Sequence, residues 1–528
     1  MEKPSYPRGE VLSARGATLL LALAGALLLF RLGAVPLLGP DEPRYARVAV
    51  EMQRSGDLVT PTLQGEAWLE KPALYYWLAS TAFRVCGETE MAARLPAVAA
   101  GLLLVGTVAM LGARLYGAAA GLHAGFILAT SLLAFAYGRA ATMDMLVAAP
   151  ITVAIGLFAL GLFGIAGRLA IPVAWAAIGI ACLAKGPLGL LLPGLVVTGY
   201  AAATRSWEPL RRWLSPIGLV VFALVAGPWY ALILIAQGGH FLDVFLLNHN
   251  LQRFTSTIHN HPGPILYYIP LLLGGFFPWS GLVLPGLGAA RPRDSRVDLF
   301  VTLWLLLPLL FFSAAGSKLP GYILPCLAPL ALLMGRAAAE MTEGASLPFW
   351  AGPRAAALVG LALGALVATT PALLLRMQEP GWRQTLPLGL WALVVTFAAS
   401  RAWGQSPRSA LALLRVGGAG LLLLLALAAP EILARQQSGR DLFLPAARRE
   451  VLAWGAWRTA WMSGYFYNDG KLREVADVGA IREAASHGPA LVLCGPSERR
   501  QLETSPGFRT LTLAEGPRQN ALLRVSLR

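Results

Sequence analysis

The residues best suited to chemistry are gathered in one loop, residues 39–77, which follows the first apolar run of the chain. Asp41 and Glu42 open this loop, and the base Arg44 follows them within the motif DEPRYA. Carboxylates can act as general acids or bases. They can equally cap a helix expected over Pro43–Arg54, because negative charge at a helix start compensates the helix dipole.

The second half of this loop adds an acid, a base and aromatic side chains. Trp68 precedes Glu70 and Lys71, and Tyr75 to Trp77 form an aromatic run. Aromatic residues alone are typical of the headgroup level of a membrane. The combination of acids, bases and aromatics on one interfacial loop favours a functional surface.

Three further charged residues lie near the ends of apolar runs: Asp144 in GRAATMDML, Lys185 in LAKGP and Lys318 in SKLPGYILP. Ionisable groups at membrane depth are costly, and they usually face protein or water. A capping aspartate and snorkelling lysines are the structural alternatives. Since all three fall on the same side as residues 39–77, we predict that they share one cavity.

A second loop, residues 238–263, holds four of the six histidines and Arg253. The spacing of these histidines matches no closed zinc motif. Arg253 is the stronger candidate, because a guanidinium group suits bidentate contacts with phosphate. The histidines of this loop are His240, His249, His259 and His261.

Lipid must surround the elements that position these loops, because the composition is that of an integral membrane protein. Apolar residues make up 56% of the 528-residue chain and charged residues 13%, with a mean hydropathy of +0.60. Soluble proteins carry roughly 25% charged residues. The composition therefore excludes a single soluble enzyme, a disordered scaffold and a fibrous repeat.

Apolar runs of about 17 to 25 residues predict about thirteen membrane-spanning helices, and short gaps leave about twelve or fourteen open. The first run could be a cleaved signal peptide, but Arg31 and the apolar stretch to Leu38 favour an uncleaved span. The predicted spans lie near residues 17–38, 95–115, 117–138, 145–167, 169–184, 187–204, 214–236, 264–288, 298–315, 319–337, 355–375, 385–401 and 409–430.

The net charge of +15 and the pI of about 10.1 would suggest nucleic acid as the partner of a soluble protein. Here arginines occupy short gaps between apolar runs, so the positive-inside rule explains them and no nucleic acid is expected. The rule places the N-terminus in the cytoplasm and residues 39–94, 238–263 and 431–528 on the opposite side. The four cysteines are scattered and define neither a disulfide framework nor a zinc site.

We divide the chain into a transmembrane domain, residues 1–430, and a small domain, residues 431–528, in which charged residues return. The pattern of the second segment predicts an α/β fold without a recognisable catalytic motif. Strands are expected over Trp461–Tyr467, Ala490–Cys494 and Ala521–Leu527, and a helix over Asp441–Trp454.

Seven motifs occur in one order within residues 17–340: DEPRYA, SGDLVTPTLQGEAWLEKPALYYW, GRAATMDML, LAKGP, HNLQRF, YYIPLLLGGFFPW and SKLPGYILP. Together they resemble the signature of the aminoarabinose lipid A transferases, which are glycosyltransferases of the GT-C fold akin to protein O-mannosyltransferases. The resemblance implies an α-helical polytopic membrane protein with about thirteen spans and a small C-terminal α/β soluble domain. It also implies a sugar donor linked to undecaprenyl phosphate.

The resemblance further implies roles for individual residues. Asp41 is expected at the sugar-transfer centre, with Glu42 and Asp144 as further catalytic candidates. The expected donor-phosphate group comprises Arg44, Tyr45, Lys71, Arg253 and Tyr322, and the expected cavity lining comprises Lys185 and Lys318. Some relatives bind zinc through the glutamate of EKP and a histidine near LQRF, so a zinc or other divalent cation would be held here by Glu70 and His249.

We therefore expect a monomeric, multi-pass enzyme of the bacterial inner membrane, with its site and C-terminal domain facing the periplasm. It would transfer 4-amino-4-deoxy-L-arabinose from undecaprenyl phosphate to lipid A phosphate, with inversion. Transfer of a hexose or hexosamine to another glycolipid or to protein is the alternative within this class. The alternatives of other classes are a polysaccharide polymerase or ligase and a secondary transporter or lipid flippase, although the absence of a visible repeat in the sequence disfavours a transporter.

Overall fold

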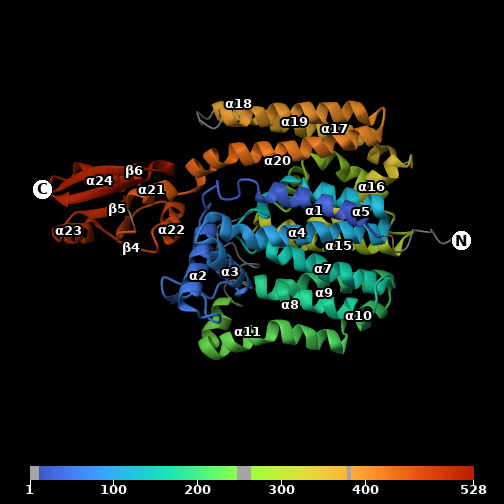
Figure 1. The fold of residues 1–528 in the computed structure, drawn as a ribbon, viewed down its shortest axis with the longest axis horizontal. Helices are drawn as coiled ribbons and strands as arrows, with labels where there is room; N and C mark the ends of the chain where they lie inside the picture. Colours follow the sequence, from blue (N-terminus) through green and yellow to red (C-terminus); the bar gives the residue numbers. More distant parts are fainter. Residues whose placement is uncertain (1–10, 246–262, 346, 377–381, 447) are drawn as a thin grey trace.

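The computed structural model describes residues 11–245, 263–345, 347–376, 382–446 and 448–528. Figure 1 shows a bundle of long helices, a group of loop helices across one end of it, and an α/β domain beyond that end. Helix α20 (Pro407–Gln437) runs from the bundle to this domain. The boundary predicted after Pro430 therefore falls inside a continuous helix.

The described helices of the bundle follow the predicted apolar runs, often with shifted or broken ends. They are α1 (Ala14–Leu29), α4 (Glu90–Tyr116), α5 (Ala118–Ala129), α6 (Leu132–Tyr137), α7 (Asp144–Leu162), α8 (Ala170–Lys185), α9 (Leu188–Thr204), α10 (Glu208–Trp213), α11 (Pro216–Leu242), α13 (Tyr268–Gly275), η2 (Trp279–Leu282), α14 (Val283–Ala289), α15 (Arg296–Ala314), η3 (Pro320–Cys326), α16 (Leu327–Thr342), η4 (Phe349–Ala351), α17 (Pro353–Ala368), α18 (Thr370–Arg376), α19 (Trp382–Trp403) and α20.

Length and apolar composition identify the membrane-crossing helices. Within the described ranges, 8 helices are long and apolar enough to cross a membrane, or up to 9 if the bent pair formed by α13 and η2–α14 is one span. The shorter apolar helices α1, α5, α8 and α9 fall at other predicted spans. The chain is thus a multi-pass membrane protein, as predicted, while the number thirteen stays a prediction.

The first loop folds into two helices and a small hairpin at the end of the bundle that faces the α/β domain (Figure 1). Helix α2 follows Gly39 and ends at Gly56, whose φ angles of +61° and +73° lie in the left-handed region that favours glycine. The helix predicted over Pro43–Arg54 is confirmed, with an earlier start. The elements of this loop are α2 (Asp41–Ser55), β1 (Thr62–Leu63), β2 (Glu66–Ala67) and α3 (Leu74–Cys86).

The C-terminal domain is an α/β sandwich around a five-stranded sheet of order β4-β3-β5-β7-β6. Strand β3 pairs in parallel with β4 and β5, whereas β7 is antiparallel to β5 and β6. Alternate side chains of the sheet pack against α21 and α22 on one face and against α23 and α24 on the other. The elements are α21 (Arg440–Phe443), η5 (Leu444–Ala446), β3 (Val451–Trp454), α22 (Arg458–Tyr467), β4 (Leu472–Glu474), α23 (Val478–Ser486), β5 (Ala490–Cys494), α24 (Pro496–Thr504), β6 (Phe508–Glu515), η6 (Pro517–Gln519) and β7 (Ala521–Leu527).

Strands β5 and β7 confirm two predicted elements of this domain, but two other predictions are wrong. The segment Trp461–Tyr467 lies in helix α22 rather than in a strand. Glycine at 464 lets this helix approach α21 closely, because a Cβ there would lie 2.6 Å from the Phe443 ring. The helix predicted over Asp441–Trp454 is limited to short turns, because Val451–Trp454 forms strand β3 between β4 and β5.

Candidate active site

One charged pair lies where two membrane helices meet the loop layer. Helix α7 begins at Asp144, α8 ends at Lys185, and their side chains form an ion pair. The Lys185 Nζ also lies 5.0 Å from the centroid of the Tyr322 ring, which η3 contributes. Glycine at 321 permits this approach, since a Cβ there would lie 2.6 Å from the Asp144 Cγ. Three residues predicted from separate motifs therefore form one cluster.

Asp41 lies at the start of α2 with its carboxylate half-exposed. The Arg44 Nη2 donates a hydrogen bond to Asp41 Oδ1 at 2.6 Å, and the exposed fraction of the side chain is 50% for Asp41 but 10% for Arg44. The Arg44 guanidinium also lies 4.8 Å from the centroid of the Trp68 ring. A buried cation held by an aromatic ring thus positions an accessible carboxylate.

The surroundings of Tyr45 connect Asp41 to the membrane cluster. Burial raises the pKa of the Tyr45 hydroxyl, and the negative charges of Asp41, Glu70 and Asp144 raise it further, while Arg44 opposes them. Three carboxylates from separate segments therefore lie within electrostatic reach of one side chain. Tyr45 itself is 6% exposed and packs edge-on against neighbouring tyrosine rings. This burial suits a positioning role better than the predicted contact with donor phosphate.

The two predicted lysines differ in their surroundings. Lys71 is partly buried and its Nζ donates to the Glu70 carbonyl oxygen at 3.1 Å. Its positive charge also acts on the Asp144 carboxylate. Lys318 is 8% exposed and its Nζ donates to the Ala315 carbonyl oxygen at 2.6 Å. The geometry therefore supports Lys71 as a site residue and gives Lys318 a partner within its own loop.

Glu42 differs from its neighbour Asp41 because its carboxylate is enclosed. It forms an ion pair with Arg94 at 2.6 Å and accepts backbone hydrogen bonds from Leu38 and Ala141, each at 2.7 Å. Glu42 is 5% exposed and Arg94 2%. The predicted catalytic role of Glu42 does not fit this burial. The carboxylate instead joins the start of α2 to the turn that precedes Asp144.

Arg94 was not predicted, although it is the partner of Glu42. It also donates to three carbonyl oxygens at the end of the first apolar run, those of Leu32, Val35 and Pro36. A lone arginine before an apolar run reads as an ordinary flank of a span. Its pairing with Glu42 could not be predicted, because the two residues lie far apart in the sequence.

Part of the predicted site lies outside the described residues. Arg253 and the histidines His249, His259 and His261 belong to this part. Within the ranges that the structure describes, no group of three or more His, Cys, Asp or Glu residues could hold a metal ion. The predicted pairing of Glu70 with His249 in a metal site is therefore left as a prediction.

Known proteins match this chain over much of its length. Residues 70–231 match the family described as dolichyl-phosphate-mannose-protein mannosyltransferase. An undecaprenyl phosphate-alpha-4-amino-4-deoxy-L-arabinose arabinosyl transferase of Pectobacterium carotovorum subsp. carotovorum is 34% identical over 410 residues, which cover 74% of this chain and 72% of that protein. A protein of the same name from Pseudomonas paraeruginosa is 34% identical over 400 residues, which cover 73% of this chain and 70% of that protein. This chain belongs to the arabinosyl transferase family.

A solved structure resembles this member of the arabinosyl transferase family over nearly its whole length. The crystal structure of ArnT from Cupriavidus metallidurans bound to undecaprenyl phosphate has a TM-score of 0.81 and 25% sequence identity to it. The match covers 97% of this chain and 98% of that chain. The predicted membrane glycosyltransferase fold with a C-terminal α/β domain is confirmed, including the domain for which the motifs had shown no resemblance.

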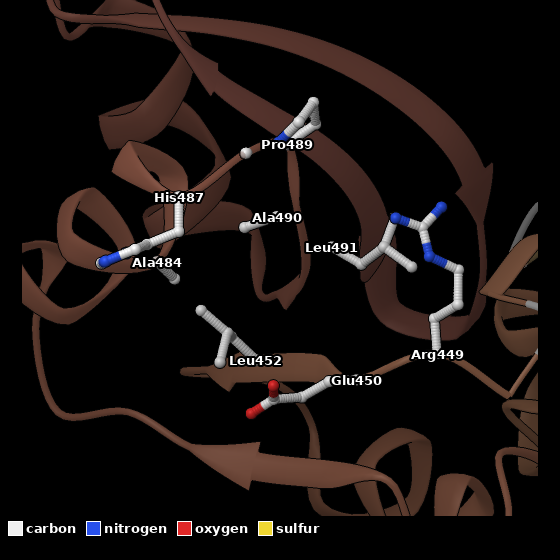
Figure 2. A pocket seen from close by; sticks show the side chains of 9 residues that line it. Arg449, Glu450, Leu452, Ala484, His487, Pro489, Ala490 and Leu491 are labelled. Carbon is white, nitrogen blue, oxygen red and sulfur yellow. The ribbon is translucent and has the colours of Figure 1, made fainter.

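The C-terminal domain of this transferase has a cavity of its own, of about 430 Å³ (Figure 2). Arg449, Glu450 and Leu452 line one side of it, and His487 and Ala490 the other. The cavity lies at the amino ends of β3 and β5. Ligands of α/β sheets usually bind outside the carboxyl ends of the strands. Its lining shares no residue with the cluster around Asp41, so it does not extend the candidate active site.

Proposed function

We propose that this chain transfers 4-amino-4-deoxy-L-arabinose from undecaprenyl phosphate to lipid A, as a monomer at the periplasmic face of the bacterial inner membrane. Membership of the arabinosyl transferase family supports the sugar and the donor. The observation that carries the proposal is the position of Asp41. Its accessible carboxylate lies at the start of α2, where the neighbouring Glu42 accepts a hydrogen bond from Ala141 in the turn that leads to Asp144 and its partner Lys185.

In the proposed reaction, the bond between the anomeric carbon and the phosphate oxygen breaks, and the acceptor oxygen bonds to the opposite face of that carbon. The polyprenyl phosphate leaves with the bonding electrons, so negative charge grows on it. Cations fixed before the reaction stabilise such charge effectively. We assign this role to Lys71, and to Arg253 from the loop outside the described residues. Lys185 and Tyr322 line the same cluster.

Asp41 is proposed to face the anomeric carbon. If the acceptor is a lipid A phosphate, which is already anionic near neutral pH, Asp41 orients it or stabilises positive charge on the sugar. If the acceptor is a hydroxyl group, Asp41 accepts its proton as a general base. A single carboxylate that acts in this way agrees with inversion at the anomeric carbon. A metal at Glu70 and His249 remains a proposal, and no step depends on it.

The experiment that tests the function compares lipid A from cells with and without the gene by mass spectrometry. Expression should add the mass of one pentosamine to a lipid A phosphate. The purified protein should give the same product from lipid A and the undecaprenyl-phosphate-linked sugar. Unchanged lipid A in both assays would contradict the proposed acceptor, and a hexose mass would contradict the proposed sugar.

A further inference from the structure

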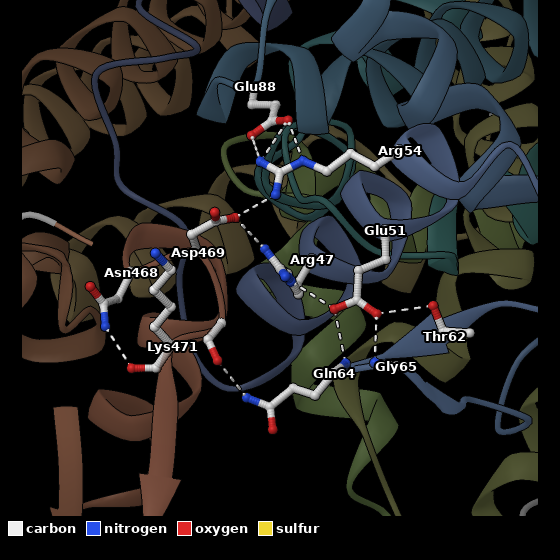
Figure 3. A network of polar contacts seen from close by, with 11 residues as sticks. Arg47, Glu51, Arg54, Thr62, Gln64, Gly65, Glu88, Asn468, Asp469 and Lys471 are labelled. Atoms are coloured by element: carbon white, nitrogen blue, oxygen red, sulfur yellow. Dashed lines mark hydrogen bonds and ion pairs between the residues drawn. The ribbon is translucent and has the colours of Figure 1, made fainter. Parts of the chain in front are cut away.

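The turn between α22 and β4 of the C-terminal domain holds helix α2 through one carboxylate (Figure 3). Asp469 Oδ1 accepts hydrogen bonds from Arg47 Nη1 at 2.6 Å and from Arg54 Nη1 at 2.7 Å. The two arginines are about two helical turns apart, so they lie on one face of α2. One residue of the C-terminal domain therefore fixes this face at two points.

The backbone of the turn is shaped for this contact. Asp469 has a φ of +56° and Gly470 a φ of +72°, both in the left-handed region. That region is unfavourable for residues other than glycine, although aspartate tolerates it better than most. A Cβ at position 470 would lie 3.0 Å from the Arg47 guanidinium. Glycine thus lets the turn approach α2 closely.

Arg47 extends the contact to the β1–β2 hairpin. Its Nε donates to Glu51 Oε1 at 2.7 Å. The hairpin leads to Lys71, so Asp469 is connected both to the helix that carries Asp41 and to the segment that carries Lys71. The Glu51 carboxylate accepts hydrogen bonds from the hairpin at 2.9, 2.8 and 3.1 Å, which come from Thr62 Oγ1, Gln64 N and Gly65 N respectively.

The C-terminal domain also holds the chain just before α2. The Tyr467 hydroxyl accepts a hydrogen bond from the Leu37 N–H at 2.7 Å and donates to Glu90 at 3.1 Å. The Gly39 N–H donates to the Gln437 carbonyl oxygen at 2.9 Å. Residues near the C-terminus of the chain therefore hold both helix α2 and the segment just before it.

We propose that the C-terminal domain is a positioning element of the active site and that Asp469 is the positioning residue that sets the orientation of α2. This inference rests on the proposed transferase function, because it concerns the rate of that reaction. Without the Asp469 carboxylate, Arg47 and Arg54 lose their shared acceptor. Arg47 keeps Glu51 and Arg54 keeps Glu88, so α2 stays folded, but its outer face is no longer held by the C-terminal domain. We infer that the helix that carries Asp41 then becomes more mobile.

The test uses the full-length Asp469→Asn variant in lipid nanodiscs, with initial rates measured at varied donor and lipid A concentrations. We expect kcat to fall about tenfold, which corresponds to a coupling of ordinary size between distant sites. Amide hydrogen exchange over residues 41–55 should be faster, while exchange in the C-terminal sheet and the thermal midpoint stay unchanged. Asp469→Glu should recover part of the rate. Glu450→Gln is the matched control, because Glu450 is 65% exposed in its pair with Arg473.

Wild-type kcat and wild-type exchange over α2 in Asp469→Asn would overturn the inference. So would a loss of activity that accompanies faster exchange in the C-terminal sheet, since Asp469 would then serve only the domain's own stability. If Asp469→Asn does not fold, Arg54→Gln removes one of its two donors at a side chain that is 41% exposed. Arg54 also pairs with Glu88, so Glu88→Gln serves as the control for the loss of that second contact. If the wild-type protein transfers no sugar to lipid A, the proposed function fails, and exchange over α2 still tests the contact.

Discussion

Each end of the helical bundle contains a pair of opposite charges, but the two pairs differ in how far their side chains are exposed. Beside the loop layer, Asp144 and Lys185 keep 19% and 16% of their side chains exposed. At the opposite end, Asp298 and Arg336 keep 0% and 3%. Asp298 also accepts a hydrogen bond from the Arg291 N–H at 2.9 Å, and Arg336 donates to Glu340 at 2.8 Å.

We attribute this difference to role: the enclosed charges hold the structure, whereas the partly exposed charges belong to the proposed site. A fully enclosed ion pair cannot exchange partners without uncovering a charge in an apolar medium, which is very costly. A partly open pair can admit a phosphate or a sugar. The same contrast divides Glu42, which is enclosed, from the half-exposed Asp41. The exposure of a charged side chain, rather than its charge alone, therefore distinguishes the residues of the proposed active site.

The largest expected effect on activity is that of Asp41→Asn, which should reduce the rate of sugar transfer about 10³-fold, because a charge fixed at the reacting centre contributes about that much. Its thermal midpoint should stay unchanged, since the carboxylate is half-exposed. Initial rates of the purified variant measure the effect. Asp441→Asn, at a carboxylate that is 61% exposed, serves as the control. Retention of a tenth of wild-type activity would remove Asp41 from the centre.

Asp298→Asn should act on stability instead. The substitution breaks the enclosed pair with Arg336 and leaves Glu340 as the acidic neighbour of that arginine. The unfolding free energy should therefore fall by about 3 kcal/mol, the lower end of the cost of breaking a buried ion pair. Denaturant unfolding in detergent measures this loss, and kcat per folded molecule should equal that of the wild type. A fall in kcat without a loss of stability would show that this end of the bundle also serves the chemistry.

Asp144→Asn should lower activity rather than stability. The rate should fall about tenfold, whereas the unfolding free energy should change by about 1 kcal/mol or less, because this pair is partly exposed. Lys185 keeps its contact with the Tyr322 ring in this variant, which limits the structural damage. The same two assays apply. A stability loss as large as that of Asp298→Asn, with normal kcat, would contradict the distinction between the two ends.

The smallest expected effect concerns pH. Burial acts to raise the pKa of Asp469, but hydrogen bonds from Arg47 and Arg54 and their charges outweigh it, so the pKa lies below its ordinary value. The contact is therefore fully formed above about pH 4, which is the ordinary pKa of an aspartate. It weakens as the pH falls through the lowered pKa of Asp469. The difference in α2 exchange between wild type and Asp469→Asn should be constant from about pH 5 to 8 and shrink on acidification. A difference that grows at low pH would contradict this assignment.

Much of the fold could be predicted because hydropathy and helix periodicity are local signals. The apolar runs, helix α2 and strands β5 and β7 were found in this way. The strand predicted over Trp461–Tyr467 was wrong because aromatic residues favour strands in general, whereas this segment forms helix α22, which packs on a face of the sheet. Strand β3 was missed because its four residues gain their hydrogen bonds from β4 and β5, which lie later in the chain.

Within the site, residue types could be predicted better than partners. The sequence marks Asp144, Lys185 and Tyr322 as unusual, but their contact depends on how three helices pack. The enclosure of Glu42 by Arg94 depends on residues far apart in sequence, so it had no local signature. The contact of Asp469 with α2 joins two domains and was not predictable from either segment alone.

Helix α20 has a further consequence for the contact between the domains. Its 31 residues are about 46 Å long, at about 1.5 Å per residue; most of them pack in the bundle, and the rest form a stiff arm that holds the C-terminal domain at the loop layer. A stiff tether of suitable length keeps two surfaces at a high effective concentration, so weak contacts stay formed. A few hydrogen bonds around Asp469 are then sufficient, because the arm has already removed most of the entropy that a separate subunit would lose on docking.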